Sequence, residues 1–389
     1  MKLVILLVGL VSLSWLWVPM ANAAGTQLNW LEAPPADTAQ FEKAMAPKPW
    51  QFPQDFGAHE DYQTEWWYYT GNMATDEGRE FGFQLTFFRQ ALAPEPAQPV
   101  ANQASHWRSN QVYSAHFTIS DIAQKKFYPY ERFSRGTVGL AGAETEPYHV
   151  WLEDWSATEV APGQVRLQAQ TAEVALDLLV EQTRPPVLQG DHGLSIKGLE
   201  PGNASYYYSL VQQPTTGTIT VQGHPYSVSG LTWKDHEYST SSLSAGTVGW
   251  DWFSMQFDNG SALMLYLLRH EDGTLETTSA GTFIAPAGET TPLSWQDWQL
   301  KVLDTWKSPK TGAVYPAKWT IEIPKLALTL QGQPLMPNQE LNVATATYWE
   351  GAVEFDGQQA NETLHGKGYV ELTGYADRLD ALLSARTPT

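Results

Sequence analysis

Short stretches in which every second residue is apolar recur along this chain, and they constrain the fold more than any other feature. Residues 81–87 alternate in this way, and so do residues 112–120. A period of two is typical of a half-buried β-strand. Further strands are expected at 165–180, 218–221, 262–268, 319–323 and 326–330. Turn sequences such as Asp258-Asn259-Gly260 separate them, so the pattern predicts an all-β chain built as a barrel or a sandwich.

Four sequence features occur twice in the same order. An acid followed by aromatic residues occurs at 65–68 and again at 251–253, and each leads into an apolar strand that ends in arginine. The later pairs lie at 153–155 and 296–298, 207–209 and 348–350, and 230–232 and 371–373. This order predicts a duplicated unit, with a first domain at 61–242 and a second at 246–377. Helical periodicity is convincing only from Leu379 to Arg386, which predicts a short helix in the C-terminal tail, 378–389.

The N-terminus has the features of an export signal. Lys2 is followed by an apolar run from Leu3 to Trp17 and by the small-residue sequence Ala21-Asn22-Ala23, an arrangement typical of a cleavable signal peptide. The run is shorter than the roughly 20 apolar residues that a membrane-spanning helix needs. We therefore expect a signal peptide at 1–23, a periplasmic or secreted mature protein, and an arm at 24–60 that lies against the first domain.

Composition narrows the class of ligand. The formal net charge of −19 disfavours binding to nucleic acid or to anionic lipid surfaces. The absence of cysteine excludes disulfides and thiolate metal sites. The chain contains 17 Trp, 17 Tyr and 14 Phe, which either fill the interiors of the barrels or line a cavity for an apolar small molecule.

Three aromatic-rich motifs carry a family resemblance. They are DYQTEWWYYTGN at 61–72 followed by GFQLTFFR at 82–89, WKDHEY at 233–238, and GWDWFS at 249–254. With these motifs the chain, over about residues 55–377, resembles the hydroxyneurosporene synthase family, also called the carotenoid 1,2-hydratase or AttH-like family. The resemblance implies two tandem lipocalin-like antiparallel β-barrels packed together. It also implies a mixed set of activities: some members hydrate a carbon–carbon double bond of an acyclic carotenoid, and many bacterial members have no established reaction.

Hydration of an unactivated alkene needs a strong general acid, a surround that tolerates a carbocation, and a water molecule. A carboxylic acid held neutral by apolar surroundings can donate the proton, and aromatic faces stabilise the cation by about 0.5–2 kcal/mol each. Asp235, His236 and Glu237 lie between two aromatic residues and offer these parts. On a strand, Asp235 and Glu237 share one face, whereas His236 points to the other face with Lys234 and Tyr238. We take His236 as the residue that positions water or a proton and one of the two carboxyls as the acid; alternatively, the three residues tie the barrels together by hydrogen bonds.

The resemblance implies a catalytic set of a histidine and a tryptophan in the central motif and a tyrosine and an aspartate further on. His236 matches the histidine, and Tyr238 stands where the tryptophan is expected. Tyr266 matches the tyrosine, but Leu268 stands where the acid is expected. The acid is then Asp251 or Glu237, or it is absent and the protein only binds its ligand.

Two further acids lie beside aromatic residues and have competing structural roles. Asp251 suits an interdomain ion pair or a turn cap as well as catalysis. Glu65 favours an ion pair with an arginine such as Arg89 or Arg269, because a buried acid is costly unless it is paired. The aromatic residues expected to line a ligand site are Trp66, Trp67, Tyr69, Trp233, Tyr238, Trp250 and Trp252.

Other chemistries find less support in the sequence. His106 and His116 are far apart and no histidine cluster predicts a metal site, and neither a G-x-S-x-G motif nor a glycine-rich phosphate loop is present. No cofactor is expected. Two functions are favoured: a cofactor-independent lyase or isomerase acting on an isoprenoid or polyene, or a carrier of an apolar molecule that passes it to an export-type transporter. A third possibility, a purely structural interaction module, predicts no internal cavity. We expect a monomer in every case.

Overall fold

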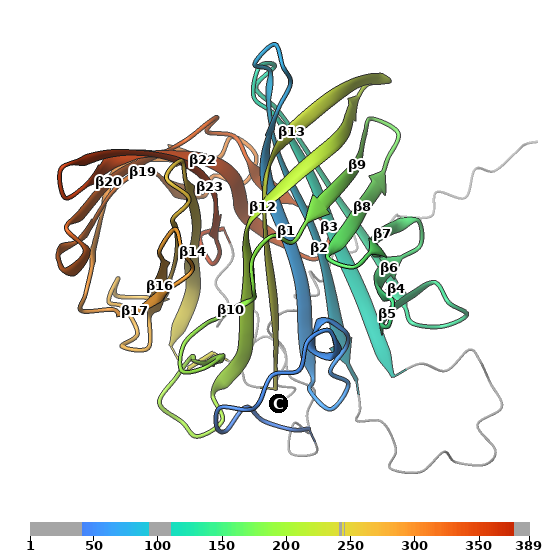
Figure 1. Cartoon of the computed structure of the whole chain (residues 1–389), viewed down its shortest axis with the longest axis horizontal. Helices are drawn as coiled ribbons and strands as arrows, with labels where there is room; N and C mark the ends of the chain where they lie inside the picture. Colours follow the sequence, from blue (N-terminus) through green and yellow to red (C-terminus); the bar gives the residue numbers. More distant parts are fainter. Residues whose placement is uncertain (1–40, 93–109, 241–242, 245, 377–389) are drawn as a thin grey trace, which may run out of the picture.

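The computed structural model describes residues 41–92, 110–240, 243–244 and 246–376. Within these residues the chain is all-β and forms two antiparallel, barrel-like sheets, which confirms the predicted fold class (Figure 1). Two single 3₁₀ turns, η2 (Gln54–Phe56) and η3 (Pro324–Leu326), interrupt the strands. No helix among the described residues is long and apolar enough to cross a membrane. The predicted signal peptide, residues 24–40 of the arm and the predicted C-terminal helix lie outside the described residues.

The first sheet, sheet A, is built from β1 to β13 in the order β4-β3-β2-β1-β13-β12-β9-β8-β7-β6-β5, with β10 and β11 paired to β12. Its strands are β1 (Thr64–Ala74), β2 (Glu80–Ala91), β3 (Gln111–Asp121), β4 (Lys126–Arg135), β5 (Ala141–Thr145), β6 (Tyr148–Leu152), β7 (Trp155–Ala161), β8 (Gln164–Gln170), β9 (Val174–Glu181), β10 (Val187–Leu188), β11 (Leu194–Ile196), β12 (Ala204–Val221) and β13 (His224–Ser239).

The second sheet, sheet B, has the order β17-β16-β15-β14-β23-β22-β20-β19-β18, with β21 paired to β22. Its strands are β14 (Thr247–Phe257), β15 (Ala262–His270), β16 (Ala280–Ile284), β17 (Thr290–Ser294), β18 (Gln299–Lys307), β19 (Val314–Ile323), β20 (Leu328–Pro334), β21 (Glu340–Asn342), β22 (Thr347–Gln359) and β23 (Glu362–Leu372).

The two sheets repeat one connection pattern. In sheet A the first strand, β1, lies between the second strand, β2, and the last strand, β13; in sheet B, β14 lies in the same way between β15 and β23. This pattern matches the order of the sequence echoes, because the acid–aromatic motifs at 65–68 and 251–253 fall on β1 and β14. Pairing the last strand with the first curls each sheet toward a barrel.

Because side chains alternate between the two faces of each strand, apolar side chains are buried in three regions: inside sheet A, inside sheet B and between the two sheets. One face of sheet A encloses residues such as Phe83, Phe117 and Leu178, and one face of sheet B encloses Phe253 and Trp319 among others. The outer faces of β1, β12 and β13 pack against sheet B. We call this third region the seam; its buried apolar residues are Tyr68, Val187, Tyr207, Val211 and Trp233 from sheet A and Trp252, Ala262, Met264, Tyr266, Leu268, Ile284, Ala352 and Tyr369 from sheet B.

Candidate active site

Strand β13 presents consecutive residues to two different environments. Trp233 belongs to the seam, where its ring lies 6.2 Å from that of Trp252. His236 faces the interior of sheet A and stacks on Trp67, with ring centroids 5.0 Å apart. Asp235 therefore faces the seam, as the predicted alternation requires.

The Asp235 carboxyl is buried at the seam and accepts three hydrogen bonds. Tyr207 Oη donates to Oδ2 at 2.6 Å, while Ser209 Oγ and Trp233 Nε1 donate to Oδ1 at 2.5 and 2.7 Å. Trp252 Nε1 in turn donates to Tyr207 Oη at 3.1 Å, which links the carboxyl to sheet B. Burial raises the pKa of Asp235 to about 7 even though the three donated bonds favour the carboxylate. Near neutral pH this group is thus present in both forms and can give or accept a proton.

Two more carboxyls, which the sequence analysis did not select, face the seam from sheet B. Glu350 on β22 and Glu371 on β23 are direct cross-strand partners. Tyr68 Oη donates to Glu350 Oε1 at 2.6 Å. Burial raises the pKa of Glu371 to about 8, and burial together with the Glu371 charge raises the pKa of Glu350 well above its usual range. Together with Asp235 they form a group of buried seam acids whose pKa values are all raised.

A lysine–glutamate pair lies at the same interface. Lys197 Nζ contacts Glu237 Oε1 at 2.9 Å, and Ser205 Oγ also donates to that oxygen. Burial alone lowers the pKa of Lys197, but the neighbouring Glu237 carboxylate outweighs it and the pKa is raised. Lys197 Nζ also lies 4.2 Å from the centroid of the Tyr266 ring. The structure thus brings the predicted residues Tyr266 of sheet B and Glu237 of sheet A to the seam, where Asp235 also lies. Leu268 packs in the seam cluster.

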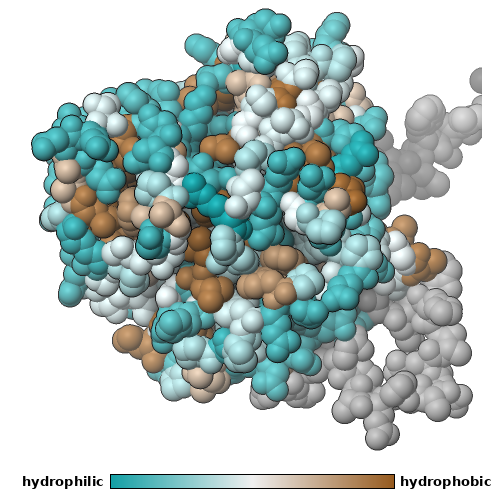
Figure 2. All heavy atoms as spheres, viewed as in Figure 1, coloured by the Kyte–Doolittle hydropathy of each residue, from teal (hydrophilic) through white to brown (hydrophobic). Residues whose placement is uncertain are grey.

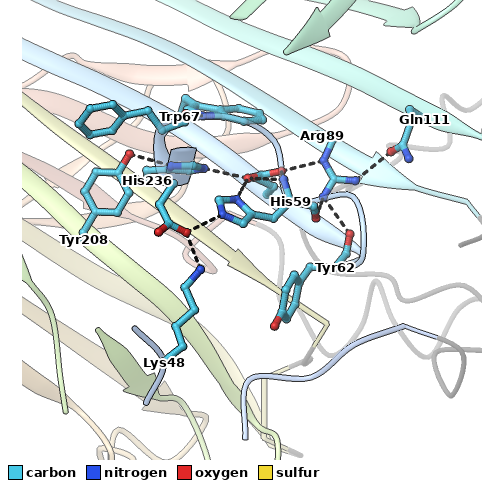
Figure 3. Close-up of polar contacts among 11 residues, drawn as sticks. Lys48, His59, Tyr62, Trp67, Arg89, Gln111, Tyr208 and His236 are labelled. Atoms are coloured by element: carbon cyan, nitrogen blue, oxygen red, sulfur yellow. Dashed lines mark hydrogen bonds and ion pairs between the residues drawn. The ribbon is translucent and has the colours of Figure 1, made fainter. Parts of the chain in front are cut away.

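His236 lies on the opposite face of β13 and has different partners (Figure 3). Its Nε2 lies 2.8 Å from Glu65 Oε1, and its Nδ1 lies 2.9 Å from Tyr208 Oη. Burial lowers the pKa of His236 to about 4, so the imidazole is neutral at pH 7. A neutral ring that donates from Nε2 to the carboxylate accepts at Nδ1 from the tyrosine. The predicted joint action of His236 with Asp235 or Glu237 is therefore not supported by the geometry, because the strand separates them.

Glu65 forms the predicted ion pair. Arg89 Nε donates to Glu65 Oε2 at 2.8 Å, and both side chains are fully buried. His59 Nδ1 lies 2.8 Å from Glu65 Oε1. Burial would raise the pKa of Glu65, but the Arg89 charge and the hydrogen bonds from His236 and His59 hold it well below its usual range.

The arm contributes to this network in a way that its sequence did not reveal. His59 Nε2 lies 3.1 Å from Asp55 Oδ1, and Lys48 Nζ bonds the same oxygen at 2.5 Å. Burial raises the pKa of Asp55, but bonds from His59, the Gln51 backbone and Lys48 lower it to about 2. Figure 3 shows the resulting chain of contacts from Lys48 to His236. The proline-rich sequence around these residues carries no period that would have predicted it.

His59, Glu65 and His236 also have the composition of a metal site. Their three ligand atoms lie within 4.8 Å of one another. However, both histidines are hydrogen-bonded to the same Glu65 oxygen, and the Arg89 guanidinium occupies the other oxygen. A buried guanidinium beside the carboxylate disfavours a second cation. The arrangement fits a closed hydrogen-bond network better than a metal centre.

Asp251 lies away from the seam acids. Arg269 Nε donates to its Oδ1 at 2.8 Å, and Tyr375 Oη lies 3.1 Å from both carboxylate oxygens. The pair joins β14 to β15 within sheet B, so the ion pair is not the interdomain one that was offered as an alternative. It repeats in sheet B the Glu65–Arg89 pair that joins β1 to β2.

The aromatic residues predicted to line a ligand site divide between the two faces. Trp66, Trp233, Trp250 and Trp252 pack at the seam. The other three, Trp67, Tyr69 and Tyr238, do not: the first two belong to the interior of sheet A, and Tyr238 stacks on His59 with centroids 3.7 Å apart.

An open groove runs between the sheets at one end of the seam. Its volume is about 420 Å³, and its walls include Ser229–Leu231 of β13, Gln256 of β14 and Lys367 of β23. On the face shown in Figure 2, hydrophobic side chains gather between the two sheets. Among the described residues, the lining of this groove includes none of the seam acids Asp235, Glu350 and Glu371.

Comparison with known proteins assigns the chain to a family. Residues 43–375 match the family described as AttH-like. The chain belongs to the AttH-like family. A crystal structure of an AttH protein from Nitrosomonas europaea is 35% identical, with a TM-score of 0.76 over 86% of this chain and 100% of that chain. The structure of kievitone hydratase from Nectria haematococca shares the fold, with a TM-score of 0.65 and 15% identity over 90% of this chain and 99% of that chain.

Two curated relatives of this AttH-like protein are a hydratase and a dehydratase. Kievitone hydratase of Fusarium solani subsp. phaseoli is 25% identical over 54% of this chain and 59% of the relative. Dehydratase asqC of Emericella nidulans is 25% identical over 54% of this chain and 60% of the relative. The alignments therefore span about three fifths of the length of these relatives. The resemblance read from the motifs is confirmed at the level of the AttH-like family.

Proposed function

We propose that this AttH-like protein is a cofactor-independent hydratase or dehydratase that acts on a carbon–carbon double bond of an apolar small molecule at the seam. The observation that carries the proposal is the Asp235 carboxyl, buried among Tyr207, Trp233 and Trp252 with a pKa raised to about 7. Such a group can protonate an alkene and, in the reverse direction, take up the proton again.

The surroundings of Asp235 suit the charge that develops on the substrate. Protonation of an alkene leaves a carbocation, which the faces of Trp233 and Trp252 stabilise. The protonated Glu350 and Glu371 add no full negative charge that would trap the cation as an ester. The similarity to a hydratase and a dehydratase supports the same reaction class, and the aromatic walls favour an isoprenoid or polyene substrate.

The reaction is tested in ¹⁸O-labelled water with a panel of acyclic isoprenoid alkenes and prenyl-bearing phenols. Mass spectrometry of the products is expected to show one labelled oxygen per converted molecule. Asp235→Asn is expected to reduce the rate by about 10²-fold or more, which is typical of losing a general acid. Asp177→Asn, a carboxyl-to-amide change at a surface pair with Arg166, is the matched control and is expected to keep the full rate.

The alternative is a carrier that binds the same class of molecule without converting it, and the exposed edges of Trp66 and Trp250 at the seam favour binding of some apolar partner. If the wild-type chain retains panel compounds through gel filtration and returns all of them without ¹⁸O, the hydratase proposal fails and the carrier takes its place. As part of the carrier alternative, we also propose that the protein is periplasmic or secreted and that it delivers its ligand to an export-type transporter.

A further inference from the structure

Lys234 is a buried lysine surrounded by aromatic rings. Its side chain points from β13 into sheet A and is 2% exposed. Its Nζ lies 4.3 Å from the ring centroid of Tyr148, 5.1 Å from Phe56, 5.5 Å from Tyr69 and 5.8 Å from Tyr208. Within the described part of the chain, no carboxylate lies within ion-pair distance of this nitrogen.

This environment favours the neutral amine. Burial lowers the pKa of Lys234 to about 7, and the more distant Glu159 carboxylate opposes that shift only in part. Tyr69, Tyr148 and Tyr208 stay protonated because burial raises the pKa of each. They supply no negative charge to hold an ammonium ion.

Lys197 provides a comparison within the same molecule. It is half-buried, its Nζ lies 2.9 Å from Glu237 Oε1 at the seam, and its pKa is raised. Lys197 is thus the counter-ion of a carboxylate, whereas Lys234 has aromatic faces in place of a counter-ion. A desolvated lysine in an apolar pocket is the form that reacts with carbonyl groups.

We propose that Lys234 binds apolar aldehydes covalently, as an imine, in the interior of sheet A. The neutral Nζ adds to the carbonyl carbon, and a proton moves to the carbonyl oxygen to give a carbinolamine. Loss of that hydroxyl with the remaining nitrogen proton gives the C=N bond and one water molecule, so no oxidant or reductant is needed. This site is separate from the seam and does not rest on the proposed hydratase activity.

The aromatic rings around Lys234 Nζ select among aldehydes. Four aromatic rings surround the nitrogen, so a flat or hydrocarbon aldehyde gains contacts that a charged one does not. Phe56 of η2 covers the amine from the arm, and its carbonyl accepts a hydrogen bond from Trp67 Nε1 at 3.1 Å. The dark-blue arm crosses the lower end of sheet A in Figure 1. Entry therefore requires the Phe56 ring to move.

The test uses the full chain, trans-cinnamaldehyde at pH 7 and sodium cyanoborohydride, which converts an imine to a stable secondary amine. Peptide mapping then gives the rate of labelling at each lysine. With a pKa of about 7, about half of Lys234 is free base, roughly 10³-fold more than for a lysine with an ordinary pKa near 10.4. We expect Lys234 to be labelled at least about tenfold faster than the exposed Lys301 or the paired Lys197.

Two variants and a second aldehyde test whether the fast labelling comes from Lys234 and from its aromatic surroundings. Lys234→Arg keeps a long basic side chain but has no primary amine, and we expect it to lose the fast adduct. Phe56→Ala is expected to accelerate labelling of Lys234 while leaving Lys301 unchanged. Glyoxylate, which is charged, is expected to show no preference for Lys234. Equal rates at Lys234 and Lys301 with cinnamaldehyde, in both the wild type and Phe56→Ala, would overturn the proposal. Because this readout is independent of alkene hydration, its failure would leave the proposed function untouched.

Discussion

Replacing Glu65 by glutamine tests whether the buried network of sheet A is held by an ionised carboxylate. The change keeps the size of the side chain but removes its charge. Arg89, whose side chain is fully buried, then keeps only neutral partners: the side chain of Gln111 at 2.9 Å and the carbonyls of His59 and Tyr62 at 2.8 Å. Removing one partner of a buried ion pair costs about 3–5 kcal/mol, and we expect the free energy of unfolding to fall by that amount.

Urea unfolding at pH 7, followed by tryptophan fluorescence and far-ultraviolet circular dichroism, measures the loss. The matched control is Asp177→Asn, which breaks the Arg166–Asp177 pair on β8 and β9, whose side chains are 48% and 43% exposed. An exposed pair of this kind contributes about 0.2–1 kcal/mol. A loss for Glu65→Gln no larger than that of the control would refute the reasoning, since it would mean that the carboxylate is not ionised or that Arg89 is compensated elsewhere.

The dependence on pH supplies a second check on the same variant. The folded protein holds the pKa of Glu65 well below its usual range. Its contribution to stability is therefore fully present above the unfolded pKa of about 4.3 and is lost as the pH falls through the folded value. The difference in stability between the wild type and Glu65→Gln is expected to be constant from about pH 6 to pH 8 and to narrow below about pH 4.

Further predictions concern the seam. Glu350→Gln is expected to change the free energy of unfolding by less than about 1 kcal/mol at pH 7, because glutamine resembles the protonated acid; a loss comparable with that of Glu65→Gln would show that Glu350 is ionised. Burial raises the pKa of Asp235 to about 7, so its stabilising contribution is present below the unfolded pKa and is lost as the pH rises through about 7. Asp235→Asn should therefore flatten the decline of the urea midpoint between about pH 4 and pH 7, and an unchanged decline would contradict the assignment. Tyr207→Phe, which removes one hydrogen bond to the carboxylate form, should move the pH profile of any alkene conversion upward, whereas a downward shift would contradict it.

The local pattern of the sequence predicted much of the architecture. Alternation at 81–87 and 112–120 placed those residues on strands β2 and β3, and it also assigned Asp235 and His236 to opposite faces of one strand. That Glu65 pairs with an arginine followed from the cost of burying an unpaired acid, and of the two arginines offered, Arg89 is the partner in the structure. These inferences succeeded because each depends on neighbours along the chain or on a general rule of charge burial.

The acids of sheet B could not be found in the same way. Glu350 and Glu371 stand in the sequence as members of repeated motifs, with nothing to distinguish them from surface carboxyls. Their raised pKa values arise because β22 and β23 pair in register and then pack against sheet A, and that packing joins residues far apart in sequence. Asp55 and His59 of the arm were missed for the same reason.

Strand β13 carries the residues of both proposed reactions, alkene hydration and imine formation, on its two opposite faces. Its side chains alternate, so Asp235 meets the seam and Lys234 meets the interior of sheet A, although the two residues are adjacent in sequence. Each lost its hydration on folding, and burial favours the neutral form of both: the acid keeps its proton and the amine gives its proton up. If the faces are independent, Asp235→Asn will slow alkene conversion by about 10²-fold or more without changing the rate of cinnamaldehyde labelling at Lys234. A parallel loss of both would mean that β13 itself is displaced, and neither site could then be assigned from that variant.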